Sequence, residues 1–221
     1  QYGHVIKHLE VAHLEALPVP VLRDALLEDF NGMVNAALDH RNHAHQLSLA
    51  AEIRFEQNFG PFAVSDKGEV GFSVQASTAL FSCRRRFDAL PHNPMIKDIR
   101  LHLSKNAKSF TKLADAGFDV WLPTRFKRIP VVDGVPLLDS SDLFEINPDI
   151  TKHIADGNFG DAHNARVKKG WLLLARSGQI YGLNGTLTLA TEAHEDQVVS
   201  DHIIRIAPSG EPNIRLGYLY V

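Results

Sequence analysis

The sequence predicts a mixed α/β (α+β) fold, in which one globular domain is attached to a long coiled-coil helix. Three observations predict it. Apolar residues recur from Leu26 to Ala51 at alternating spacings of four and three, which is typical of a helix that pairs along one narrow stripe. Short apolar runs of strand length lie at 171–175 and 202–206. An apolar segment that follows Asn93 and Pro94 predicts a second helix, which lies in the sequence between the long helix and these two runs.

Length and composition indicate an ordinary globular protein. The 221 residues are 44% hydrophobic, which suits one domain, or one and a half, with a real core. The one cysteine, Cys83, excludes a disulfide framework and a cysteine-based zinc site, so we expect a reducing, cytoplasmic location. No apolar run approaches the about 20 residues of a membrane span. We expect no membrane association, no cofactor and no metal ion.

The first 60 residues predict a tail and a helix. Residues 1–20 have strand potential and end in Leu17-Pro18-Val19-Pro20, where two prolines predict an extended stretch. Residues 21–60 contain no proline and stop at Gly60, which predicts a helix of about 35 residues and roughly 50 Å. Such a helix is expected to act as a spacer that pairs with a second helix. Its apolar stripe, here called the seam, consists of Leu26, Phe30, Met33, Ala37, His40, Ala44, Leu47 and Ala51.

Residues 61–221 are expected to form the body of the globular domain. Alternating residues predict a strand over 70–74, and buried strands are predicted over 171–175 and 202–206. The glycines of 181–185 predict a turn.

Charge is segregated along the chain. Residues 1–60 hold four Lys or Arg against eight Asp or Glu, whereas residues 84–128 hold 11 Lys or Arg against four Asp. A basic block inside a chain of net charge −3 predicts a surface that faces phosphates. Lys105, Lys108 and Lys112 recur at helical spacing and are expected to line one helix face. The alternative is a helix face that is merely solvated.

A second polar segment, 176–185, follows the predicted strand at 171–175. Its Arg, Gln and Asn side chains carry paired donors and acceptors that match guanine and adenine edges, and its glycines allow close approach to a groove. The alternative is an ordinary hairpin. The segment is not a phosphate loop, because it lacks the Gly-Lys-Ser/Thr ending.

Several stretches, taken in order, resemble one protein family. They are residues 1–20, the seam-bearing helix, Arg86-Phe87-Asp88-Ala89, the segment 135–143, the strand 199–206 and, most specifically, 167–178 with its order of basic residues, Gly170, a strand and Arg-Ser-Gly. Together they resemble the DNA-specificity (S) subunit of type I restriction–modification systems. In that family a target recognition domain ends in a tail that leads into a long spacer helix.

The resemblance implies a noncatalytic subunit that recognises double-stranded DNA and directs methyltransferase and restriction subunits to a bipartite target. It divides this chain into a tail (1–20), a spacer helix (21–60) and a target recognition domain body (61–221). We expect DNA contacts from Arg84, Arg85, Arg86, Lys105, Lys108, Lys112, Arg125, Lys127, Arg128, Arg176, Ser177, Gly178, Gln179, Tyr181 and Asn184.

The order of the pieces predicts assembly. The family's subunit runs body, tail, helix, whereas this chain runs tail, helix, body from Gln1. We therefore expect either a fragment or a natural half-subunit. A tail that lies roughly 50 Å from the domain body of its own chain cannot complete the fold of that body. An antiparallel dimer that exchanges tails removes this conflict, and His40 would help to fix its register.

Two other functions stay open. A histidine-dependent metal hydrolase would have its site near His153, His163 and His194. A coiled-coil adaptor would bind protein only. No catalytic residues are predicted, because Ser140, Ser141 and Asp142 lack a nucleophile-elbow sequence and fit a turn or a helix cap better.

Overall fold

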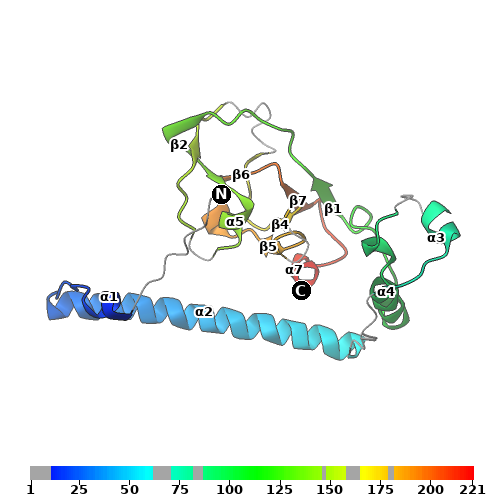
Figure 1. Ribbon diagram of the computed structural model, residues 1–221, viewed down its shortest axis with the longest axis horizontal. Coiled ribbons are helices and arrows are strands. Elements are labelled where there is room, and N and C mark those ends of the chain that lie inside the picture. The colour runs from blue at the N-terminus through cyan, green and yellow to red at the C-terminus, as the bar shows by residue number, and fades with distance from the viewer. Residues whose placement is uncertain (1–10, 62–70, 82–86, 146–147, 158–164, 179–181) are drawn as a thin grey trace, which may run out of the picture. The chain divides into compact units, whose positions relative to one another are not determined.

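The computed structural model describes residues 11–61, 71–81, 87–145, 148–157, 165–178 and 182–221 (Figure 1). The described chain combines helices with two small sheets, and this confirms the mixed α+β class. It divides into two compact units, Gln1–Ala51 and Glu52–Val221.

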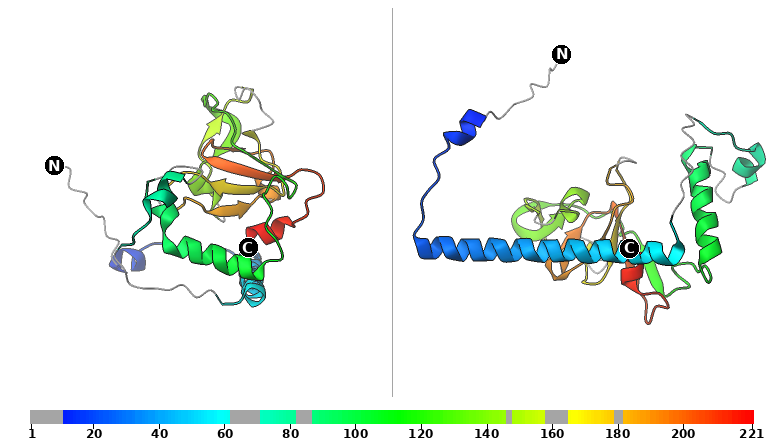
Figure 2. Two further views of the ribbon diagram at one scale, coloured as in Figure 1. Left: turned by 90° about the vertical axis from the view of Figure 1, so that its right-hand side faces the viewer. Right: turned by 90° about the horizontal axis from the view of Figure 1, so that it is seen from below.

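The long helix is confirmed as α2 (Asp24–Phe59), one continuous helix of 36 residues (Figure 2). It ends where Gly60 adopts a φ of 77°, a left-handed conformation that glycine tolerates, and Pro61 follows. No residue of α2 is buried in the single chain. Its last turns belong to the second unit, where the rings of Phe55 and Tyr218 lie 6.2 Å apart.

The tail differs from the prediction where it is described. Residues 11–15 form a short helix, α1 (Val11–Glu15), and not a strand. A strand needs a partner for its backbone groups, and no described strand pairs with this segment. The two prolines at 18 and 20 lie in a segment without regular structure, as expected. Residues 1–10 lie outside the described part of the chain.

A helical segment follows α2. It contains α3 (Ala76–Phe81), the short 3₁₀ helix η1 (Leu90–His92) and α4 (Pro94–Asn106). The predicted start of α4 is confirmed, since the Asn93 side chain accepts a hydrogen bond of 2.9 Å from Met95 N and Pro94 is the first helical residue. The strand predicted over 70–74 is wrong for residues 71–74, which have no regular structure and pair with no described strand.

The central sheet has four antiparallel strands in the order β1 (Phe118–Trp121), β7 (Ile203–Pro208), β4 (Leu172–Ala175) and β5 (Leu187–Leu189). The two predicted buried strands are therefore confirmed as β4 and β7. Leu173 and Ala175 face one core cluster, whereas Leu172 packs in another with Phe118 and Ile206. Because β4 is buried on both faces, its sequence is a continuous apolar run without alternation.

A second sheet has three strands in the order β3 (His153–Ile154), β2 (Pro130–Leu138) and β6 (Val198–Val199). The pair β2–β6 is parallel and the pair β2–β3 is antiparallel with a shift of register. Three short helices complete the described elements: α5 (Ser140–Leu143), η2 (Glu192–His194) and α7 (Leu216–Tyr220). In α5, Asp139 is the N-cap and forms a capping box with Asp142, so the predicted capping role holds for Asp142, whereas Ser140 and Ser141 are helical residues.

Candidate nucleic-acid interface

Three loops meet at one end of the four-stranded sheet. Strands β1 and β4 both run antiparallel to β7, with Trp121 opposite Arg205 and Ala175 opposite Ile203. The segments that leave β1 and β4 therefore lie beside the turn that enters β7. We call this surface the loop end. It consists of residues 122–129, 176–178, 182–186 and 200–202.

Asp201 joins two of these loops through ion pairs. One of its oxygens, Oδ2, lies 3.6 Å from Arg125 Nε, and the other, Oδ1, accepts a hydrogen bond from Arg128 Nη2. The side chain of Asp201 is 14% exposed, against 88% for Arg125 and 37% for Arg128. The Arg128 guanidinium also lies 5.7 Å from the centre of the Phe126 ring.

Asp201 stays ionised at neutral pH. Burial raises the pKa of its carboxyl, but the backbone hydrogen bond of its own turn and the charges of Arg128 and His202 outweigh burial. The pKa of Asp201 therefore lies below its ordinary value. The Asp201 carboxylate is therefore charged, and can pair with Arg125 and Arg128, over the whole physiological pH range.

The turn that presents Asp201 is fixed from inside the fold by Arg205. This side chain is fully buried on β7, donating from Nη1 to Ser200 O at 3.1 Å and from Nη2 to Val199 O at 2.7 Å. It also donates to Ile203 O. Burial lowers the pKa of Arg205 to about 10 and the Asp201 carboxylate opposes this shift, so the guanidinium is charged at neutral pH.

The segment after β4 forms the loop of a β4–β5 hairpin. Arg176 N donates to His202 O at 2.9 Å, and the Ser177 hydroxyl lies 3.3 Å from His202 Nδ1. Gly178 has a φ of 152°, and an added Cβ would lie 3.1 Å from Asn184 N, so the close approach of the two loop arms requires glycine. The predicted turn is confirmed for the described residues 182–185.

The structure brings seven predicted DNA-contacting residues to the loop end. They are Arg125, Lys127, Arg128, Arg176, Ser177, Gly178 and Asn184, and all seven are exposed. Gln179 and Tyr181 belong to the same loop but lie outside the described residues, as do Arg84, Arg85 and Arg86. The contacts of these seven residues with DNA remain a prediction.

The predicted lysine face on one helix is wrong. Helix α4 ends at Asn106 and Ala107 is extended, with φ −79° and ψ 141°. Lys105 is therefore in the last helical turn, whereas Lys108 and Lys112 follow the helix. The helix ends because the backbone of Ala107 is extended. The spacing of the lysines does not reveal this local change of conformation. All three lysines are exposed, and Lys112 precedes β1, at the opposite end of that strand from Arg125.

A small basic group before β4 is partly neutralised. Arg166 Nη2 lies 2.8 Å from Asp156 Oδ1, and Arg166 Nη1 donates to Asp196 O at 2.9 Å. Lys169 pairs with Glu192. These contacts join the segments beside β3, β4 and η2, so they give Arg166 and Lys169 a structural role.

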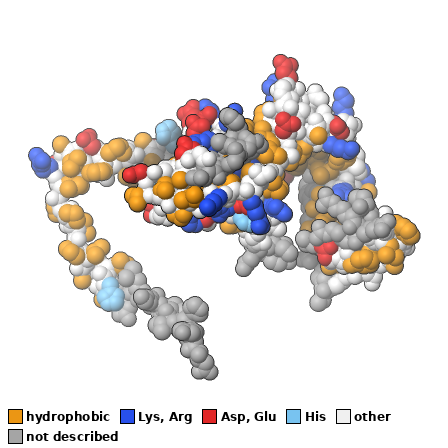
Figure 3. Space-filling model, turned by 90° about the horizontal axis from the view of Figure 1, so that it is seen from above, with side chains coloured by type: hydrophobic (Ala, Val, Ile, Leu, Met, Phe, Trp, Pro, Cys, Tyr) orange, Lys and Arg blue, Asp and Glu red, His pale blue; other side chains and the backbone are white. Residues whose placement is uncertain are grey.

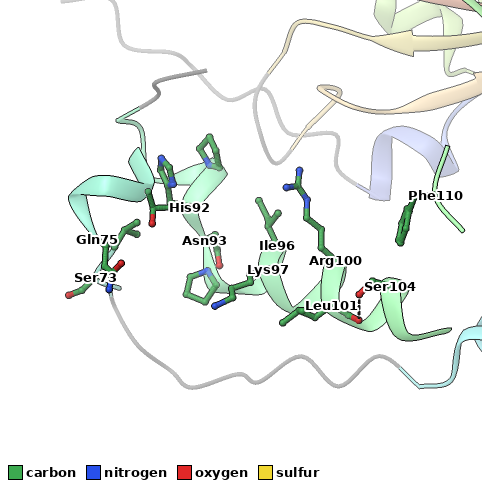
Figure 4. Close-up of a pocket in the computed structure, with 14 residues that line it drawn as sticks. Ser73, Gln75, His92, Asn93, Ile96, Lys97, Arg100, Leu101, Ser104 and Phe110 are labelled. Atoms are coloured by element: carbon green, nitrogen blue, oxygen red, sulfur yellow. Dashed lines mark hydrogen bonds between the residues drawn. The ribbon is translucent and has the colours of Figure 1, made fainter. Parts of the chain in front are cut away.

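A separate hollow of about 960 Å³ lies beside α3, η1 and α4 (Figure 4). Ile96 and Arg100 extend from the same side of α4, and the Ser104 hydroxyl is tied to Leu101 O at 2.9 Å. Lys97 also lines the hollow. None of the described residues that line this hollow belongs to the predicted DNA-contacting set. The hollow is therefore not part of the candidate interface.

The histidines of the alternative metal site do not form a cluster where they are described. His153 lies on β3, and His194 in η2 uses Nδ1 to accept a hydrogen bond of 3.1 Å from Thr191 N. Burial lowers the pKa of His194. His163 lies outside the described residues. In the described part of the chain, no three His, Cys, Asp or Glu side chains are grouped as a metal ion would need.

The sequence pattern does not reveal the roles of Asp201 in the loop end and of Arg205, which fixes the Asp201 turn from within β7. The sequence predicts only a core strand for the segment 199–206. The signal in the sequence is an arginine between Ile204 and Ile206, because a charged side chain inside a buried strand must find partners.

Comparisons with known proteins leave the site unassigned. No family model matches this chain, and no curated protein matches it. Within the residues that the structure describes, no helix is both long and apolar enough to cross a membrane.

Proposed function

We propose that this chain is a noncatalytic, sequence-specific DNA-recognition subunit of the type I restriction–modification kind, and that its loop end contacts the DNA. One observation carries the proposal. Arg125, Arg128 and Arg176 come from two separate segments of the chain, and the antiparallel pairing of β1 and β4 with β7 brings them to one end of the sheet.

The chemistry of the loop end supports this proposal. The loop end holds four cations, Arg125, Lys127, Arg128 and Arg176, against one carboxylate, Asp201. Arginine binds phosphates and also pairs with guanine edges through two parallel hydrogen bonds. Ser177 and Asn184 add neutral donors and acceptors to the same surface. A positive surface with mixed polar groups suits contacts to both the DNA backbone and the bases.

The long helix supports the proposed assembly. All seam residues except the half-buried Ala51 are exposed in the single chain, with Met33 61% and Leu47 59% accessible. In Figure 3 hydrophobic side chains lie uncovered along the part of α2 that this view shows. An apolar stripe of this length is stabilised by a partner helix. We propose a second copy, antiparallel, as that partner, with methyltransferase and restriction subunits joining the assembled spacer, as the resemblance implies.

Binding of the full chain to fluorescently labelled random-sequence duplex DNA tests the proposal. The triple variant Arg125→Ala, Arg128→Ala, Arg176→Ala should bind about tenfold more weakly or worse at low salt. Its log–log salt slope should fall by about 0.9 for each lost phosphate contact. The matched control is Lys152→Ala, Lys168→Ala, Lys169→Ala, which removes three exposed cations outside the loop end and should bind as the parent does.

The outcomes are distinct. A parent protein that retains no duplex DNA at low salt refutes the proposal. If the parent also forms dimers through α2, the protein-only adaptor becomes the better function. Equal losses of DNA affinity in the two triple variants would mean that DNA does not bind specifically at the loop end.

A further inference from the structure

Arg128 is both held in place and accessible, a combination that the other loop-end cations do not share. Its Nη2 donates to Asp201, its guanidinium lies over the Phe126 ring, and its side chain is still 37% exposed. Arg125 is 88% exposed and contacts the same carboxylate at 3.6 Å. The carboxylate therefore orients Arg128 much more strictly than Arg125.

The carboxylate is itself fixed to the sheet. Its turn is anchored by a hydrogen bond of 3.1 Å from Ser200 N to Leu138 O and by one of 3.2 Å from Ile203 N to Ser200 O. Arg205 binds the carbonyls of Val199, Ser200 and Ile203 from the buried side. Because the backbone on both sides of Asp201 is hydrogen-bonded to the core, the carboxylate has a fixed position, and it in turn fixes the position of Arg128.

We propose that Asp201 is a positioning residue that determines specificity, because it holds Arg128 in the orientation for reading a base edge and cancels part of the charge that would bind any phosphate. The inference rests on the proposed function. A guanidinium has five N–H donors, so one contact to Asp201 leaves others for a guanine edge. Because the planar group is already oriented, less side-chain freedom is lost when it meets the base.

The same ion pair should weaken binding to DNA of any sequence. Affinity for random DNA comes from cations that neutralise phosphates, and an arginine paired with a carboxylate contributes less to it. Specificity is a difference between two affinities, so Asp201 raises it in both ways. Loss of the carboxylate should therefore strengthen binding to random DNA and reduce discrimination.

The experiment compares the full-length parent with Asp201→Asn on two duplexes. One has a random sequence, and the other is the sequence that the parent selects from a random oligonucleotide pool. For Asp201→Asn, the ratio of the two affinities should fall by about tenfold, while affinity for random DNA rises about threefold. Asp201→Glu keeps the charge and should restore the ratio toward that of the parent.

A matched control removes another paired carboxylate. Glu192→Gln frees Lys169, which lies before the start of β4, whereas the loop end, with Arg176, lies at the other end of that strand. Its ratio should equal that of the parent. If Asp201→Asn does not fold, as judged by thermal melting, Asp201→Ser provides the same comparison with a hydroxyl that retains a backbone contact of the turn.

Three results overturn the inference. They are an unchanged ratio in Asp201→Asn, an equal fall in Glu192→Gln, and a parallel loss of affinity for both duplexes, which a merely structural role would give. In each of these cases a parent that still binds and discriminates leaves the proposed function standing. A parent that selects no sequence at all refutes the proposed function and the inference together.

Discussion

Arg205 shows how one buried side chain shapes an exposed surface. It lies in the central strand β7 with Trp121 and Leu173 opposite it on the neighbouring strands, so it is enclosed by the sheet on both sides. Its cost of burial is offset by hydrogen bonds to the carbonyls of Val199, Ser200 and Ile203. These carbonyls lie in the turn that carries Asp201 and at the two strand ends beside it, and this explains why a charged residue occupies a strand that is otherwise apolar.

Replacement of Arg205 by methionine should destabilise the protein by about 2 kcal/mol or more, because buried carbonyls of the turn lose their donors. Urea unfolding followed by circular dichroism measures the free energy of unfolding. Arg23→Met, at an exposed position before α2, should change it by less than about 0.5 kcal/mol. Equal stability of the two variants would show that water replaces the guanidinium in the turn.

At the scale of elements, two glycines illustrate opposite constraints. Gly134 lies in β2 where the pairing with β3 shifts register, and an added Cβ would be 2.4 Å from both Ile154 O and Val131 Cγ2. Gly32 lies inside α2, and an added Cβ would meet nothing within 4 Å. The first glycine allows two backbones to approach, whereas the second only weakens a helix.

Gly134→Ala is therefore expected to destabilise the protein by about 1–3 kcal/mol, because the clash is with backbone and with a branched side chain. Gly32→Ala should instead stabilise α2 by about 0.5–1 kcal/mol. Thermal and urea unfolding of the two variants beside the parent provide the measurement. A neutral Gly134→Ala would mean that the β2–β3 pair relaxes without cost.

At the scale of the whole molecule, the exposed seam predicts a dimer. The seam keeps its regular spacing along α2, yet none of its residues is fully buried in the single chain. Each square ångström of apolar surface that a partner helix covers contributes about 25 cal/mol. This free energy favours pairing of two copies at micromolar concentration.

Light scattering at that concentration should report twice the 24.5 kDa chain mass. Met33→Glu with Leu47→Glu should give a monomer, because two charges on each helix would enter the seam. The control, Val34→Glu with Leu49→Glu, alters residues of similar exposure outside the seam and should remain a dimer. A monomeric parent whose circular dichroism shows an intact α2 would contradict the prediction.

Local sequence chemistry is sufficient to predict several elements of this fold. The seam spacing, the absence of proline and Gly60 define α2, Asn93 and Pro94 start α4, and a continuous apolar run defines β4. Each of these signals lies within the element that it predicts. Capping, helix propensity and the burial of one strand act over a few neighbouring residues, so the sequence is sufficient for them.

Contacts between residues far apart in the chain depend on the folded state. Residues 11–15 and 71–74 have strand potential, but they pair with no described strand and therefore do not form one. The ion pair of Arg128 with Asp201 joins residues 73 positions apart, and the pairing of β1 and β4 with β7 brings them together. Strand pairing is a non-local interaction whose register depends on the whole sheet, and that is why the loop end could be assembled only from the folded chain.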